Sequence, residues 1–306
     1  MKPVYQRPLL ILNPVAGTSD PDSVREAFAQ ACRQYGWQPE VHVTREEDDL
    51  NEVVKCGLEK GCDVVLAGGG DGTVSAVASA LVGSDVPMAV IPTGTANFLA
   101  KQLDLPLKLE DAFEYLMQQP NILHLDAMCI GERHYVLNAS VGFSSALIEN
   151  TSRENKRRFG FLAYIWTAIR VLIGLQPYRF NLVVDGVAHS LRASEVFISG
   201  TSLLKEEALF KDVKMRADDG QLELFVVKAR TARDYFLLLW DIVRGRVRRS
   251  HEMSYYPLRK QVKINTKKPL IVQADGEVIG YTPVKIKVVA QAVPVLVPRV
   301  KKEEHL

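Results

Sequence analysis

Four glycines separate an apolar run from a segment with the composition of a helix. Residues 68 to 73 read Gly-Gly-Gly-Asp-Gly-Thr, between the run at 63–67 and an alanine- and valine-rich segment at 74–82. Glycine lets backbone N–H groups approach an anion closely, and a helix start adds unpaired N–H groups and the positive end of its dipole. Thr73 adds a hydroxyl. The stretch therefore predicts a strand, a phosphate-binding turn and a helix, in that order.

Asp71 is the one acid in this turn. A carboxylate beside phosphate is repelled unless a metal ion or a reacting hydroxyl lies between them, so Asp71 indicates phosphoryl transfer. The simpler alternative is a turn without a ligand, in which Asp71 only caps the helix. The stretch is neither a Walker A loop, because no Gly-Lys-Ser/Thr follows, nor a Gly-x-Gly-x-x-Gly dinucleotide motif.

The first 125 residues alternate between short apolar runs and segments with helical periodicity. The expected strands are 9–12, 41–43, 63–67 and 88–91, and the expected helices lie near 24–35, 50–58, 73–82 and 95–103. This alternation predicts an α/β domain with a doubly wound parallel sheet, in which ligands bind at the carboxyl ends of the strands. Residues 13–18, 68–73 and 92–97 are glycine- or hydroxyl-bearing loops at those ends, and Thr44 lies at the same edge.

The pattern changes after about residue 127. Short β-branched runs follow one another between Asp-Gly pairs at 185–186, 219–220 and 275–276, and helical segments interrupt them near 157–174 and 231–247. Such runs predict an antiparallel, sandwich-like domain. We therefore expect a nucleotide-binding domain over 1–127, a β-rich domain over 128–290, and a tail over 291–306 that packs back on the first domain.

Composition narrows the function classes. The chain has 306 residues, 47% of them hydrophobic, and a formal charge of +2, so it can bury a large core and has no global field that would favour nucleic acid. Its four cysteines show no Cys-x-x-Cys spacing, which favours reduced thiols in a cytoplasmic protein. The longest apolar stretch, 159–175, contains Arg170 and is too short to span a membrane. We expect a soluble protein that touches a membrane surface at most peripherally.

Six segments occur in an order and spacing that together point to one family. They are Leu10–Gly17, Ala67–Thr73, Ile91–Asn97, Asn138–Phe143, Ala217–Glu223 and Ala274–Glu277. With them the chain resembles the lipid kinases that share a catalytic domain with diacylglycerol kinases and sphingosine kinases, and it is most similar to their stand-alone bacterial members. The resemblance implies an active site between the two domains, ATP and Mg²⁺ as cofactors, and the hydroxyl of a diacylglycerol-type lipid as the acceptor.

The resemblance also implies roles for individual residues. The residues that would bind ATP are Asn13, Thr44, Gly69, Gly70, Asp71, Gly72, Thr73, Val74, Ser75 and Thr95. Glu277 matches the general base proposed for the bacterial enzymes, whereas the sphingosine kinase branch favours the acid at Asp71, and Asp126 matches a further acid near that centre. Both base assignments stay open. A structural Mg²⁺ would bind Asp219 and the carbonyls of Arg216 and Gln221, although an Asp-Gly turn needs no metal.

Other interpretations are compatible with the same residues. NAD kinases share the Gly-Gly-Asp-Gly loop, and a nucleotide- or lipid-binding regulatory protein would need no turnover. Basic residues beside aromatic ones, at 156–166 and 234–249, suit an anionic membrane surface. The simpler alternative there is a pair of amphipathic helices that cover a sheet, and we expect Trp166 and Trp240 to lie in the core rather than at an interface. Edge strands of a sandwich can pair, which allows a homodimer.

Overall fold

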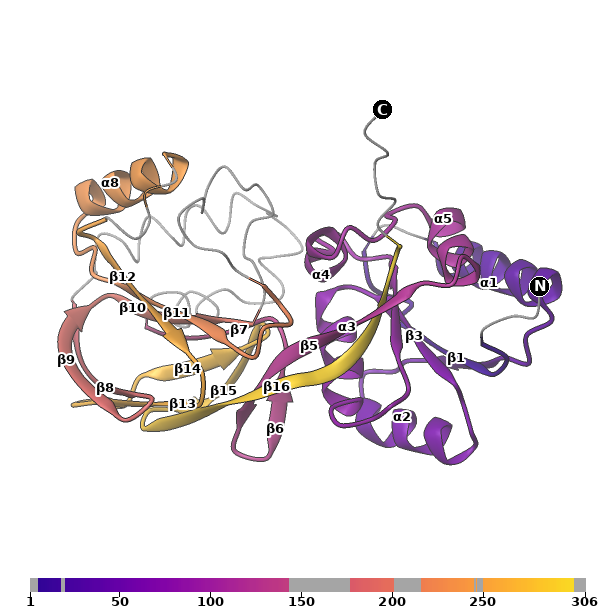
Figure 1. Ribbon diagram of the computed structural model, residues 1–306, viewed down its shortest axis with the longest axis horizontal. Helices are drawn as coiled ribbons and strands as arrows, with labels where there is room; N and C mark the ends of the chain where they lie inside the picture. The colour runs from indigo at the N-terminus through magenta and orange to yellow at the C-terminus, as the bar shows by residue number, and fades with distance from the viewer. Residues whose placement is uncertain are drawn as a thin grey trace. The chain divides into compact units, whose positions relative to one another are not determined.

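The computed structural model describes residues 5–17, 20–142, 177–200, 216–244, 246 and 250–299. The chain divides into two compact units (Figure 1). Unit 1 comprises Met1–Ala127 and Gln291–Leu306, and unit 2 comprises Met128–Ala290. The helix expected near 157–174 lies outside the described residues. None of the described helices is long and apolar enough to cross a membrane.

Unit 1 is built on a parallel sheet with the strand order β2-β1-β3-β4. Its strands are β1 (Pro8–Leu12), β2 (Glu40–Val43), β3 (Val64–Gly69) and β4 (Met88–Pro92). The far end of the last strand, β16 (Val284–Val297), adds a parallel partner to β4 through Val295 and Met88. The helical elements are α1 (Pro21–Tyr35), α2 (Leu50–Glu59), α3 (Asp71–Ala80), α4 (Phe98–Gln102), α5 (Leu109–Glu114) and the 3₁₀ turn η1 (Tyr115–Met117).

The central strands are continuous apolar runs because helices cover both faces of the sheet. Every residue of β1, β3 and β4 is buried. Helix α1 begins where the Asp20 carboxylate accepts the Ser23 backbone N–H at 3.1 Å, and it ends at Gly36, whose φ of 70° only glycine adopts readily. Its buried side, with Val24 and Phe28, packs into the core of this unit. The predicted α/β architecture is confirmed.

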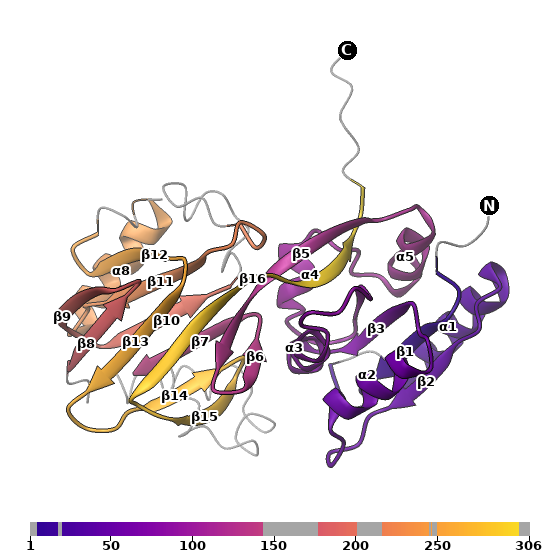
Figure 2. The ribbon, with the colours of Figure 1, turned by 60° about the horizontal axis from the view of Figure 1, so that its bottom comes forward.

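Unit 2 contains antiparallel strands in two layers (Figure 2). One layer has the order β12-β11-β10-β7-β14-β15; its strands are β7 (Asn138–Gly142), β10 (Glu195–Ser199), β11 (Leu222–Val227), β12 (Met253–Leu258), β14 (Ile271–Ala274) and β15 (Glu277–Tyr281). The other runs from the first part of β16 through β13 and β8 to β9, with β5 beside β16 and β6 beside β5; its further strands are β5 (Asn121–Ile130), β6 (Arg133–Tyr135), β8 (Tyr178–Val184), β9 (Val187–Ala193) and β13 (Gln261–Thr266).

One apolar core joins the two layers of unit 2. Phe180, Val262 and Ile286 come from one sheet and lie in the same cluster as Val196 and Leu224 from the other. The alternation of buried and exposed residues along β8 and β13 is what a half-buried antiparallel sheet requires. The predicted sandwich-like second domain is therefore confirmed.

Helix α8 (Ala232–Val243) occupies most of the segment expected to be helical at 231–247. The expectation that Trp240 is a core residue was wrong: its side chain is 47% exposed, and Phe236 and Leu237 are exposed as well. Helical periodicity identifies an apolar face, but it does not say whether another element covers that face.

Candidate functional site

Three loops meet at the carboxyl edge of the unit 1 sheet, after β1, β3 and β4. A Cβ atom on Gly94 would lie 2.4 Å from the Cα of Gly70, and one on Gly17 would lie 1.9 Å from the carbonyl oxygen of Thr93. Gly17 also has a φ of +73°. Only glycine permits backbones to approach so closely, so the glycines of separate loops hold one another in place.

Side-chain hydrogen bonds join the same loops. The Asn13 amide Nδ2 after β1 donates to the Thr73 hydroxyl at 3.0 Å, across 60 residues of sequence. The Asp71 carboxylate oxygen Oδ1 accepts the backbone N–H of Phe98 at 2.6 Å. Asp71 is the first residue of α3 and Phe98 the first of α4. The carboxylate thus connects the starts of two helices at the sheet edge.

The start of α3 offers N–H groups to an anion. Gly70 at its N-cap makes no side-chain capping bond, and a Cβ atom on Gly72 would meet nothing within 4 Å. First-turn N–H groups have no partner inside their own helix, and the helix dipole is positive there. Space beside Gly72 and a dipole aimed at it together form a place where a phosphate group can sit.

The other residues predicted from the sequence differ in their surroundings. Thr44 extends β2, with its N–H donating to the Leu12 carbonyl at 2.9 Å. Thr73 and Ser75 are buried, whereas Thr95 is exposed. Asp126 is fully buried, and its Oδ1 accepts the Gln291 N–H at 2.8 Å, so it is held by the returning end of the chain.

Sequence reasoning assigned no role to Thr93 or Asn97. Thr93 is 3% exposed, and its hydroxyl has no hydrogen-bond partner within the described part of the chain. A buried hydroxyl without a partner is costly and suits a site that a ligand completes. Asn97 has a φ of 48° and donates from Nδ2 to the Gly94 carbonyl at 2.8 Å, which shapes the same loop. The Thr-Gly-Thr sequence after a buried strand was the available signal.

Glu277 lies in unit 2, at the start of β15. Asp275 and Gly276 form the two-residue turn between β14 and β15, with φ values of 47° and 88°. Both positive values are those of a type I′ hairpin turn. Glu277 is exposed, so its carboxylate is available to solvent or to a substrate.

The turn that precedes Glu277 is held in place by hydrogen bonds to residues 136–138. The Asp275 carboxylate accepts three backbone N–H groups, from Val136 at 3.0 Å, Leu137 at 3.0 Å and Asn138 at 2.8 Å. The buried Gln273 of β14 adds contacts to the neighbouring strand β7: its Nε2 donates to the Ser140 hydroxyl at 2.9 Å and to the Asn138 amide oxygen at 3.0 Å. Sequence reasoning missed this network, because a hairpin turn alone already accounts for an Asp-Gly pair.

The candidate Mg²⁺ residues form a turn with internal hydrogen bonds. Asp219 Oδ1 accepts the Gln221 N–H at 3.2 Å, and the Arg216 guanidinium pairs with Asp218 at 3.0 Å. Oxygen donors of this kind are chemically suitable for Mg²⁺. The described residues contain no cluster of three or more acidic, histidine or cysteine side chains placed to hold a metal ion. The predicted site uses one carboxylate and two backbone carbonyls, so the metal assignment stays a prediction.

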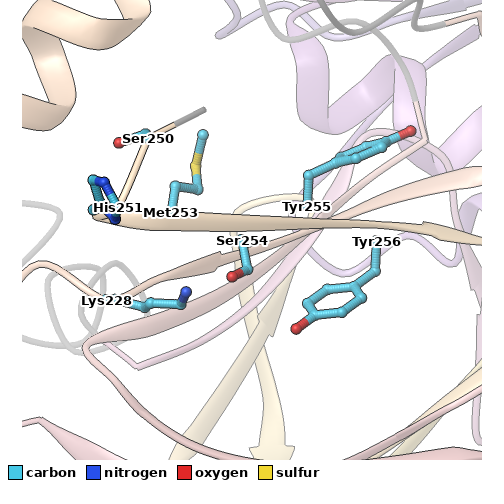
Figure 3. Close-up of a pocket in the computed structure, with 7 residues that line it drawn as sticks. All are labelled: Lys228, Ser250, His251, Met253, Ser254, Tyr255 and Tyr256. Carbon is cyan, nitrogen blue, oxygen red and sulfur yellow. The ribbon is translucent and has the colours of Figure 1, made fainter. Parts of the chain in front are cut away.

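A pocket of about 400 Å³ lies along β12 in unit 2, at the edge of its sheet. In Figure 3, Met253 and Tyr255 point to one side of the strand and Ser254 and Tyr256 to the other, and Lys228 lies on the side of Ser254. None of the residues predicted from the sequence lines it.

Comparison with known proteins identifies the family. Residues 7–129 match the diacylglycerol kinase catalytic domain, and residues 138–297 match the YegS C-terminal NAD kinase beta sandwich-like domain. The chain belongs to the diacylglycerol kinase-like lipid kinases. This membership favours the lipid kinase over the NAD kinase interpretation. The name of the second domain refers to NAD kinase only because of the likeness of its β-sandwich.

Individual relatives agree with this family of lipid kinases. A protein of Pseudomonas syringae pv. syringae named "Probable lipid kinase YegS-like" is 31% identical over 73% of this chain and 72% of its own length. The diacylglycerol kinase of Bacillus subtilis is 24% identical over 98% of this chain and 99% of its own length. A solved structure of a diacylglycerol kinase from Bacillus anthracis str. Sterne shares the fold, with a TM-score of 0.72, 18% identity and coverage of 97% and 98%.

Proposed function

We propose that this lipid kinase transfers the γ-phosphoryl group of Mg-ATP to the hydroxyl of a diacylglycerol-type lipid at the inner face of a membrane. In the reaction the lipid oxygen attacks the γ-phosphorus, its proton passes to a carboxylate, and ADP leaves. The product is a phosphorylated lipid of the kind that phospholipid synthesis consumes. The acceptor class rests on the family and on the names of its relatives, including the diacylglycerol kinase of Bacillus subtilis.

The observation that supports phosphoryl transfer is the joined set of loops at one sheet edge. Gly17, Gly70 and Gly94 pack backbone against backbone, and there is open space beside Gly72 in the first turn of α3. Phosphoryl transfer needs a fixed set of donors for the phosphate charges more than it needs covalent chemistry from the protein. A set of loops locked by close contacts meets that need.

The nucleotide residues of the proposal all belong to unit 1. The backbone of the glycine-rich turn would hold the phosphates, with hydroxyls and the Asn13 amide around it; the full set is Asn13, Thr44, Gly69, Gly70, Asp71, Gly72, Thr73, Val74, Ser75 and Thr95. We add Thr93, because its buried hydroxyl has no partner among the described residues. Mg²⁺, when bound with ATP, supplies charge neutralisation between the phosphates.

The proposal gives the two candidate bases different roles. Asp71 uses one carboxylate oxygen to accept the Phe98 N–H, which suits a residue that positions the loops and faces the Mg²⁺ ion. Glu277 stands exposed on an anchored turn, which suits a base that must meet an incoming hydroxyl. We therefore assign the proton to Glu277. Asp126, buried and held by Gln291, would support the same centre.

The test is transfer of label from γ-labelled ATP to a panel of lipids in mixed micelles, with NAD as a soluble competitor acceptor and Asp71→Asn as the blank. Labelled diacylglycerol in the wild-type reaction, and none in the blank, would support the proposal. Label on a different lipid would mean that the proposed acceptor is wrong and that phosphoryl transfer to a lipid is right. Label on NAD alone, or equal label in the blank, would overturn it.

A further inference from the structure

We propose that the exposed face of α8 is a docking surface for an anionic lipid bilayer. The face is defined by the apolar residues Phe236, Leu237 and Trp240, which are 64%, 40% and 47% exposed, and by Arg233 and Arg244 at its two ends. The inference goes beyond phosphoryl transfer and does not depend on it. Figure 1 shows α8 in orange, in unit 2.

These residues lie on one side of the helix. Arg233, Leu237, Trp240 and Arg244 follow one another at intervals of four, three and four residues, which is the spacing of a single helical face. Phe236 lies one turn before Trp240 and widens the stripe. From the first arginine to the last the face is about 16 Å long, so a helix lying flat would bring the whole stripe to a surface at once.

The opposite side of α8 is fixed to unit 2. The Tyr235 hydroxyl donates to the Ser194 hydroxyl at 2.8 Å, and Leu238 is buried. Burial raises the pKa of Tyr235 to about 12, so this hydroxyl keeps its proton at neutral pH. These contacts fix the rotation of α8 about its own axis. The side with Phe236, Leu237 and Trp240 is therefore the side left exposed.

The charges around the apolar residues suit anionic headgroups. The Arg244 guanidinium lies over the Trp240 ring, 4.4 Å from its centroid, and Arg230 and Arg246 are further exposed cations near the helix ends. The helix carries two acids. Asp234, in its first turn, accepts the N–H groups of Arg230 and Thr231 at 2.9 Å each, and Asp241 is half-buried. Aromatic and aliphatic side chains between arginines form the pattern of interfacial helices.

The size of the face argues against a protein partner. Three partly exposed side chains offer roughly 300 Å² of surface, whereas a stable protein interface needs about 800 Å² from each partner. A bilayer needs no shaped counterpart, because apolar side chains enter the headgroup layer independently and nearby arginines add to the attraction.

The decisive experiment measures sedimentation of the full chain with vesicles, without ATP, so its result is independent of phosphoryl transfer. Vesicles of phosphatidylcholine alone are compared with equal mixtures of phosphatidylcholine and phosphatidylglycerol. The test variant is Phe236→Gln/Leu237→Gln/Trp240→Gln, since glutamine is polar and favours helices. Its matched control is Leu107→Gln/Ile122→Gln/Val187→Gln, three exposed apolar residues outside α8.

We expect the wild type to bind the mixed vesicles in a salt-sensitive manner, and the α8 variant to bind at least about tenfold more weakly, with an unchanged melting temperature. The control should bind like the wild type. An Arg233→Gln/Arg244→Gln variant should lose about tenfold or more of the preference for phosphatidylglycerol. Equal binding by wild type and α8 variant, or no binding by the wild type, would overturn the proposal. A lower melting temperature of the α8 variant would also overturn it, because it would mean that the three apolar side chains pack within the chain. So would a wild-type dimer that the α8 variant no longer forms, because it would mean that the face binds a second copy.

Discussion

Asp71 and Phe98 are 27 residues apart, and the carboxylate of the first accepts the backbone N–H of the second at 2.6 Å. This bond joins the turn after β3 to the start of α4 across the sheet edge. It gives the acid of the glycine-rich turn a structural function besides any part it plays in chemistry. Two variants at position 71 are therefore needed: one that removes only the negative charge, and one that also removes the hydrogen-bond acceptor.

Asp71→Asn should keep the fold and lose phosphoryl transfer. The amide oxygen of asparagine can still accept the Phe98 N–H, so we expect a melting temperature near that of the wild type, and a rate lower by at least about 10² because the charge is gone. Asp71→Ala should lose the rate and also about 1 kcal/mol of stability. Asp85→Asn, at an exposed acid of the same unit, is the control. Wild-type transfer by Asp71→Asn would place the catalytic centre elsewhere.

Glu277→Gln should leave stability unchanged, whereas Asp275→Ala should lower it. Glu277 is exposed, so its variant should keep its melting temperature and lose about 10²- to 10⁴-fold in kcat if it is the base. Asp275 accepts three backbone N–H groups, so its loss should cost about 2 kcal/mol. Denaturant unfolding and steady-state rates measure the two quantities. A Glu277→Gln enzyme with normal kcat would return the base assignment to Asp71.

Gly94→Ala and Gly72→Ala should distinguish packing from ligand contact. A Cβ at position 94 would collide with the Gly70 backbone, whereas a Cβ at position 72 meets nothing within 4 Å. We expect Gly94→Ala to lower the stability of unit 1 by about 1–3 kcal/mol. Gly72→Ala should leave stability intact, because alanine favours a helix, but raise KM for ATP if phosphate lies there. An unchanged KM would remove phosphate from that position.

Asp219→Ala tests the predicted metal site. If Asp219 binds Mg²⁺, the wild type should melt at a higher temperature in Mg²⁺ than in EDTA, and the variant should show no such difference. Asp185→Ala is the matched control, since Asp185 also begins an Asp-Gly turn and should lose the same stability with and without the ion. Equal melting of the wild type in both buffers would leave Asp219 as a turn residue alone.

The Asp185 carboxyl should give a pH-dependent contribution to stability. Burial raises its pKa, but the backbone N–H groups of Arg259, Gln261 and Lys260 lower it more, so its pKa lies below the ordinary 3.8. A depressed carboxyl pKa stabilises the fold above the unfolded value and loses that effect as pH falls through the folded value. The cost of Asp185→Asn, about 1 kcal/mol at neutral pH, should therefore shrink below pH 3.8. Urea unfolding across this range measures it, and a cost that grows on acidification would contradict it.

The sequence was sufficient for the architecture because periodicity reports burial directly. The buried runs of β1, β3 and β4 could be recognised as parallel strands, and turn-bounded β-branched runs as the sandwich. It was insufficient for contacts between distant residues. The bonds from Asp275 to residues 136–138 cross more than a hundred positions, and nothing local marks them. The exposure of Trp240 was missed for a related reason, since its environment depends on what packs against α8.

Strand β16 gives the last part of the chain a place in the unit that is synthesised first. Val295 pairs with Met88, and Leu296 belongs to the same apolar cluster as Leu10 and Leu66. Until these residues leave the ribosome, β4 lacks this neighbour, and an unpaired strand edge is prone to join other chains. All of unit 2 must be translated after β4 and before the end of β16. We therefore expect misassembly through the edge of β4 to be most frequent during that interval.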